Sequence, residues 1–304
     1  MSAAELAPTR EDRDEIVAGR PQPRSSWTAA LPGRFLRSEL AIVFGRRRNL
    51  VLLGVLAAIP ILLAIALKVS SGSDGNGGGG DGPGFFEAIT SNGLFVAFAA
   101  LAATLPLFLP LAVAAASGDA VAGEANLGTL RYLLTIPAGR TRLLLTKYAA
   151  VVIFGLVATA LVALAGVVSG LALFGGGDVI LLSGTTTSFA DGVGRLALSV
   201  LYLSACFAAL GAIGLFMSTL TEQPIAAIVA TIGVDVLMFI LDAIPQLAWL
   251  HPWLLVDWWA AFGDLLRDPI STDAISRGLL TALVYAVVFL VAAWARFRSK
   301  DITS

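Results

Sequence analysis

The chain has 304 residues, of which 57% are hydrophobic and 13% charged, and its mean hydropathy is +0.85. Soluble domains usually carry about 25% charged residues, so this composition excludes an ordinary soluble protein. The net charge of -1 offers no general attraction for nucleic acid. One cysteine, Cys206, and one histidine, His251, are too few for a disulfide framework or a zinc cluster, so we expect no bound metal.

The first 48 residues are polar and basic, which is unlike a cleaved signal peptide. Residues 1–26 mix charges with Pro and Ala without periodicity, and we expect a disordered leader there. Residues 27–48 are expected to form an amphipathic helix in the headgroup layer, because Leu36, Leu40, Val43 and Phe44 follow helical spacing and arginines flank them. The alternative is an ordinary basic flank to the first membrane span. Residues 49–304 are predicted to form one transmembrane domain.

Six apolar stretches approach the roughly 20 residues that a helix needs to cross a bilayer. They are residues 50–69, 94–116, 148–174, 196–217, 225–243 and 278–295. Isolated strands in lipid would leave backbone groups without hydrogen bonds, so all six are expected to be helices. The fold class is therefore an all-α integral membrane protein with six transmembrane helices.

The distribution of basic residues predicts the orientation. Sixteen of the 20 Lys and Arg residues lie before the first span, between the second and third spans, or after the sixth. The other four, Lys68, Arg195, Arg267 and Arg277, belong to the opposite side. Both termini are thus expected in the cytoplasm, with the protein in a bacterial inner membrane.

Within and between the spans, small residues and prolines predict local geometry. Residues 70–84 are rich in Gly and Ser and read as a flexible outer loop. Pro106 and Pro110 lie on one face of the second span and predict a kink. Gly166 and Gly170 have the GxxxG spacing that permits close helix approach.

The connection formed by residues 245–277 contains four of the six tryptophans: Trp249, Trp253, Trp258 and Trp259. Tryptophan prefers the interface between membrane and water, so we expect a short helical segment lying against the outer leaflet. Stacking on a transported substrate is the alternative role for these rings.

No catalytic motif is present in the sequence. There is no GxxxxGK[ST] phosphate-binding loop, and no serine lies in a nucleophile-elbow context. We therefore expect neither a catalytic residue nor a cofactor in this chain.

The most informative polar segment is GEANLGTLRYLLTIPAGRTRLLLTK, residues 123–147, on the predicted cytoplasmic side. Gly128 and Pro137 bracket a short helical stretch in which Leu130, Leu133 and Leu134 share one face. Such a helix could dock into a groove on a cytoplasmic partner or rest on the lipid headgroups.

This segment resembles the cytoplasmic signature of ABC exporter permeases of the ABC-two type, in particular single-domain permeases grouped with bacitracin, sodium and copper-enzyme-maturation exporters. The resemblance extends to the basic helix before the first span, the six spans, the outer helical segment and the ending RFRSKDI. The matching positions are Glu124, Gly128, Thr129, Leu130, Arg131, Leu133, Leu134, Pro137, Arg140 and Lys147.

The resemblance implies a permease subunit that forms the translocation path as a dimer with a second copy or a sister permease. It also implies a separate ATPase subunit, which would hold ATP and Mg, and residues 123–147 as the coupling helix seated on it. Membrane lipid is the other expected partner, and nucleic acid is not.

Asp235 lies near the middle of the fifth span, with Thr231 and Asp242 on the same helical face. A carboxylate there costs about 2.5–3.5 kcal/mol on insertion scales, so it normally faces a partner or a cavity. It could contact cargo or a cation along the translocation path, or it could fix helix packing as a hydrogen-bonded or protonated group.

Two other functions are compatible with parts of the sequence. Asp235 favours an ion-driven secondary transporter, but no pair of corresponding broken spans indicates an inverted repeat. A non-transporting membrane assembly or immunity protein is the second alternative, and the segment 123–147 argues against both.

Overall fold

The computed structural model describes residues 32–73, 92–127, 139–181 and 183–299. The chain divides into two units, Met1–Phe35 and Leu36–Ser304. The arrangement below is that of the second unit. The expected leader 1–26 and most of the glycine-rich loop 70–84 lie outside the described residues.

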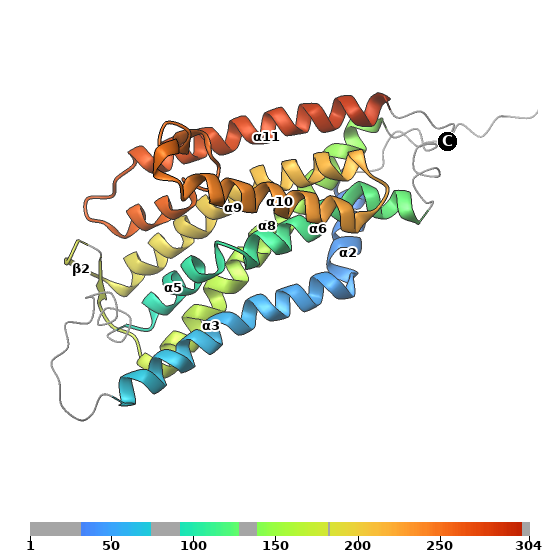
Figure 1. Ribbon diagram of the computed structural model, residues 1–304. Coiled ribbons are helices and arrows are strands. Elements are labelled where there is room, and N and C mark those ends of the chain that lie inside the picture. Colours follow the sequence, from blue (N-terminus) through green and yellow to red (C-terminus); the bar gives the residue numbers. More distant parts are fainter. Residues whose placement is uncertain (1–31, 74–91, 128–138, 182, 300–304) are drawn as a thin grey trace, which may run out of the picture. The chain divides into compact units, whose positions relative to one another are not determined.

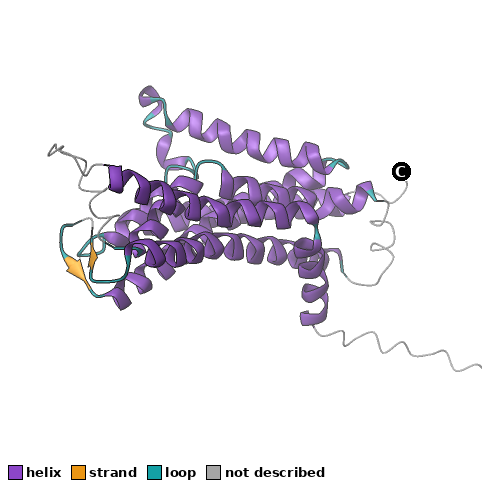
Figure 2. Ribbon diagram, turned by 90° about the horizontal axis from the view of Figure 1, so that it is seen from below, coloured by secondary structure: helices purple, strands orange, loops and turns teal. Residues whose placement is uncertain are grey.

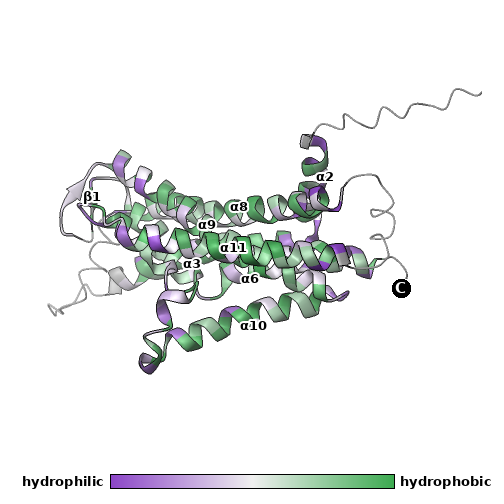
Figure 3. Ribbon diagram, turned by 90° about the horizontal axis from the view of Figure 1, so that it is seen from above, coloured by the Kyte–Doolittle hydropathy of each residue, from purple (hydrophilic) through white to green (hydrophobic). Residues whose placement is uncertain are grey.

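Five long helices form most of the structure (Figures 1 and 2). They are α3 (Arg47–Ser73), α8 (Arg140–Phe174), α9 (Phe189–Leu220), α10 (Pro224–Asp242) and α11 (Asp273–Ser299). Each is long and apolar enough to cross a membrane. Figure 3 shows that hydrophobic residues occupy most of the length of these helices.

The predicted second span is two helices, α5 (Leu94–Thr104) and α6 (Phe108–Asn126), which meet at an angle of 59°. The expected kink at the prolines is thus confirmed. Pro106 lies in the break, and Pro110 occupies the first turn of α6, where a missing N–H costs no intrahelical hydrogen bond. The Thr104 hydroxyl, a single donor, is shared between the carbonyls of Ala100 and Leu101, at 2.8 and 3.0 Å, in the last turn before the break.

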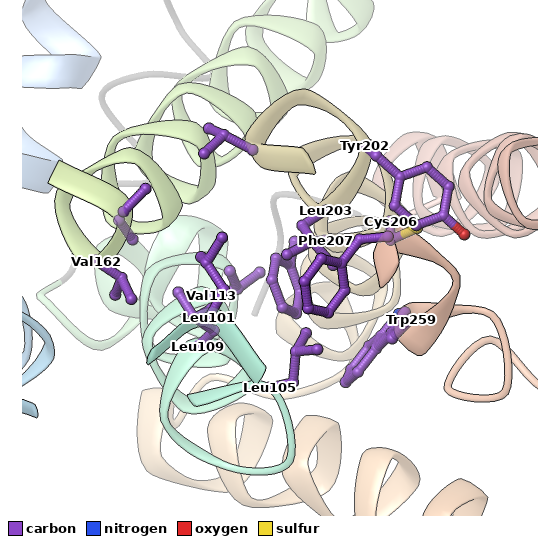
Figure 4. Packing of buried hydrophobic residues seen from close by; sticks show 14 of the residues in the cluster. Leu101, Leu105, Leu109, Val113, Val162, Tyr202, Leu203, Cys206, Phe207 and Trp259 are labelled. Carbon is purple, nitrogen blue, oxygen red and sulfur yellow. The ribbon is translucent and has the colours of Figure 1, made fainter. Parts of the chain in front are cut away.

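Helix α9 lies at the centre of the bundle, where it packs against α6, α8, α10 and α11. By contrast, α3, α10 and α11 expose most of their apolar side chains, as expected for helices that face lipid. The core beside α9 contains Leu203, Phe207 and Trp259 (Figure 4). The rings of Phe207 and Trp259 meet edge to face, with centroids 5.1 Å apart.

The outer connection contains the expected short helical segment, as three 3-10 helices: η2 (Pro245–Leu247), η3 (His251–Trp253) and η4 (Trp259–Leu266). Helix η4 packs on α9 and α11. The interfacial position expected for all four tryptophans is wrong for Trp259. Trp259 is only 2% exposed and fills the core, whereas Trp249 and Trp253 are each 71% exposed, as expected for side chains at a membrane surface. Two antiparallel strands of two residues each, β1 (Val179–Ile180) and β2 (Thr186–Thr187), are a small addition to the expected all-helical fold.

The amphipathic helix expected over residues 27–48 corresponds to α2 (Pro32–Gly45), which a break at Arg46 separates from α3. Its apolar stripe packs on the bundle: Val43 is buried, and Leu36, Leu40 and Phe44 lie against the core. The stripe thus belongs to the protein interior at least in part.

The GxxxG pair in α8 marks the crossing of α8 with α5. A Cβ on Gly166 would lie 2.6 Å from the Cα of Ala97, and one on Gly170 would overlap the carbonyl of Gly93. These contacts confirm the close approach that the spacing predicts.

Gly170→Ala is therefore expected to push α5 away from α8 and to lower stability by about 1–3 kcal/mol, the usual cost of overpacking. The thermal midpoint of the purified protein in detergent measures this. Gly233→Ala on α10, where a Cβ meets nothing within 4 Å, is the matched control. Equal midpoints for the two variants would contradict a tight crossing.

Candidate functional site: a buried charge cluster that joins α2, α3, α6 and α8

A buried lysine joins three helices, α2, α6 and α8. Lys147 of α8 is 2% exposed, and its ammonium donates to both carboxylate oxygens of Glu39 on α2, at 3.3 and 3.2 Å. It also donates to Glu124 Oε1 near the end of α6. Each carboxylate residue is 7% exposed. An isolated buried charge costs several kcal/mol, so these groups hold the three helices in one geometry.

A second ion pair network lies beside the first and fastens the junction of α2 and α3. Asp119 of α6, 4% exposed, binds Arg46, and Arg48 reaches its Oδ2 at 3.0 Å. Arg48 also donates to the Ala115 carbonyl at 3.0 Å. The Asn49 amide donates to the carbonyl of Val43 at 2.8 Å, which braces the break between the two helices.

Together the two networks balance three carboxylates against three cations. All of these charged residues except Arg48 line a common cavity of about 20 Å³, which has room for roughly one water. We call these six side chains the charge cluster; its members are Glu39, Arg46, Arg48, Asp119, Glu124 and Lys147.

Two members of the charge cluster lie near the two ends of the predicted coupling segment, residues 123–147: Glu124 in α6 and Lys147 in α8. Of the residues assigned to ATPase coupling, Glu124 is brought directly onto Lys147. Arg140, at the first position of α8, donates to the Arg298 carbonyl of α11 at 2.9 Å. The other coupling residues lie outside the described residues; they are Gly128, Thr129, Leu130, Arg131, Leu133, Leu134 and Pro137.

Sequence reasoning missed Glu39 and Asp119 as partners of these cations. Asp119 follows directly on an apolar run, and this isolated acid among small residues was the available signal. Glu39 looked like an ordinary polar residue of an amphipathic helix. Its role depends on α2 folding back against α8, which local periodicity does not reveal.

Two of the three polar residues predicted in the fifth span, Thr231 and Asp235, are buried in the bundle. The buried stripe of the otherwise exposed α10 consists of Ala227, Thr231 and Asp235, which are spaced four residues apart. The Thr231 hydroxyl donates to the Ala227 carbonyl at 2.7 Å. Asp235 is 1% exposed, and neither of its carboxylate oxygens has a hydrogen-bond partner among the described residues.

Asp242 does not share the deep burial of Thr231 and Asp235. It lies half-buried at the end of α10, beside Asp257 of the outer connection. Burial raises the pKa of the Asp257 carboxyl, and the negative charge of the neighbouring Asp242 raises it further. These two acids therefore form a separate pair at the opposite end of α10 from Pro224.

A group of metal-binding side chains is not found in the described parts of the chain. No three of their His, Cys, Asp or Glu side chains are grouped so as to hold a metal ion. Cys206 is buried in the apolar core.

Helices α3, α8, α9, α10 and α11, with the bent pair α5 and α6, define a multi-pass helical membrane protein. The chain belongs to a protein family of unknown function, DUF2705, whose family model matches residues 81–303. No curated protein matches the sequence.

Lys147→Met is expected to destabilise the protein by about 3–5 kcal/mol, because it leaves two buried carboxylates without their cation. The triple variant Glu39→Gln, Glu124→Gln, Lys147→Met should recover part of this loss. Thermal unfolding in detergent measures both. Arg267→Met, which breaks a more exposed pair with Asp264, serves as control and should cost about 0–1 kcal/mol. A Lys147 variant as stable as this control would contradict the clamp.

Proposed function

We propose that this chain is the transmembrane permease subunit of an ATP-driven ABC exporter. The observation that carries the proposal is the segment 123–147, whose exporter-like residues begin and end at the charge cluster. The subunit would lie in a bacterial inner membrane with six spans and both termini in the cytoplasm. A second copy or a sister permease would complete the translocation path.

The proposed mechanism is mechanical. A separate ATPase subunit binds ATP with Mg, and its closure moves the coupling helix formed by residues 129–136. Because Glu124 and Lys147 join α6 and α8, the helices before and after this segment in the chain, a push on it would move both helices together. Through Glu39 the same push reaches α2, which would lie at the cytoplasmic membrane surface. The coupling requires that ATPase contacts differ between the two states of the permease.

Affinity purification of the full chain from its own host, in mild detergent, tests the assembly. A co-purifying soluble-type ATPase with Walker motifs supports the exporter. Its absence, under conditions that preserve other membrane complexes, would favour the ion-driven transporter or the non-transporting assembly or immunity protein.

Leu133→Asp is expected to abolish ATPase capture and ATP-dependent export while the permease stays folded, since a carboxylate would replace an apolar docking contact. Mass spectrometry of the purified complex measures ATPase capture, transport in vesicles measures export, and the thermal midpoint measures folding. Leu220→Asp, at the 49% exposed end of α9, is the control that should keep its ATPase. Normal capture and export in Leu133→Asp would overturn the docking assignment.

A second candidate function, ion-driven transport, is favoured by Asp235. A buried carboxyl with no hydrogen-bond partner among the described residues is costly for packing, so a role in contacting cargo, a cation or a proton would account for it.

Asp235→Leu is expected to preserve or raise the thermal midpoint, because it removes a polar group that costs about 2.5–3.5 kcal/mol at a helix centre. Export measured in vesicles should fall, and Asp235→Asn should change its pH dependence. Val236→Ala, on the lipid-facing side of the same helix, is the control. Unchanged export and pH dependence in Asp235→Asn would leave Asp235 a packing residue only.

A further inference from the structure

A groove of about 310 Å³ lies between the η3 and η4 region and the first turns of α11. Its walls are mostly apolar and include the rings of Trp253, Trp258 and Tyr285 and the side chains of Leu280 and Val284. The one charged residue in the lining is Arg277.

The aromatic walls of the groove are held in place by hydrogen bonds. The Tyr285 hydroxyl donates to the Trp253 carbonyl at 2.9 Å, and the Trp258 indole donates to the Pro252 carbonyl at 3.1 Å. Tyr202 of α9 donates to the Trp258 carbonyl at 2.6 Å. The site is thus formed before any ligand arrives, which lowers the entropic cost of binding.

Gly278 lets α11 approach this wall closely. A Cβ at this position would lie 3.0 Å from the Cβ of Trp258 and would overlap the Tyr202 hydroxyl. The glycine therefore brings Arg277, its neighbour in the chain, next to the aromatic rings.

Arg277 has no hydrogen-bond or ion-pair partner within the described ranges of the chain. The other arginines of this end of the bundle differ. Arg195 is paired with Asp191 and bonded to two carbonyls, and Arg267 is paired with Asp264. The exposed guanidinium of Arg277 is therefore available to an anionic group from outside the protein.

The lining of α11 follows helical spacing, from Arg277 through Leu280 and Thr281 to Val284 and Tyr285. The groove thus runs along the helix from a cation near its end into the apolar part of the span. Leu280 and Val284 are 62% and 52% exposed, so this surface faces lipid. Its charge and polarity suit an amphiphile with an anionic head and a hydrocarbon tail.

We propose that this groove is a binding site for an anionic phospholipid. The phosphate lies on the Arg277 guanidinium, an acyl chain runs along Leu280 and Val284, and Trp253 and Trp258 flank the glycerol region. Indole rings favour this depth of the membrane. The site goes beyond the proposed export function and does not depend on an ATPase partner.

Native mass spectrometry of the full-length protein tests the site, after equilibration with equal amounts of phosphatidylglycerol and phosphatidylcholine. The wild type is expected to retain phosphatidylglycerol preferentially. Arg277→Gln should reduce that preference about fivefold, the worth of one basic residue at an anionic membrane surface. Arg277→Lys should keep most of it, and Arg267→Gln, the matched control, should keep all of it.

Two further measurements separate the head from the tail of the ligand. Val284→Trp fills the groove and should reduce retention of phosphatidylglycerol while the charge stays. Added inorganic phosphate should leave retention unchanged, and displacement by it would mean that the site takes a free anion. Equal retention of the two lipids by the wild type, or an unchanged preference in Arg277→Gln with a normal thermal midpoint, would overturn the proposal.

Discussion

The charge of Lys147 constrains one whole end of the bundle. An ammonium that is 2% exposed is tolerated only beside carboxylates, and these come from two different helices, Glu39 on α2 and Glu124 on α6. Asp119 extends the constraint to α3 through Arg46 and Arg48. Four helices thus meet at one electrostatically balanced point, which lies near the end of α6 and in the second turn of α8.

Away from this cluster, small residues and shape hold the helices together. Lipid supplies no hydrophobic force between apolar helices, so association depends on close van der Waals contact. The contacts of Gly166 with Ala97 and of Gly170 with Gly93 provide it between α5 and α8. The break at Pro106 changes the direction of the chain there, and α9 becomes the central helix on which the others pack.

Asp235 and Arg277 are not used by this packing, and they lie in contrasting surroundings. Asp235 is buried without a hydrogen-bond partner among the described residues, where polar groups are costly and commonly functional. Arg277 is exposed beside a preformed aromatic groove. The first belongs to the interior, where a transported species could be met. The second belongs to the surface that faces lipid. A role of Asp235 in transport and lipid binding at Arg277 therefore concern different parts of the protein.

The sequence by itself determined the elements. Each predicted apolar stretch coincides with a long helix or the bent pair, the kink lies at the two prolines, and the GxxxG pair marks a close crossing. These features follow from hydrophobic length and backbone chemistry, which are local properties. Only the tertiary structure decided that Trp259 fills the core, that the stripe of α2 packs on the bundle, and that Glu39 meets Lys147. Those contacts join residues far apart in the chain, and they depend on which helix faces pair, which local periodicity does not encode.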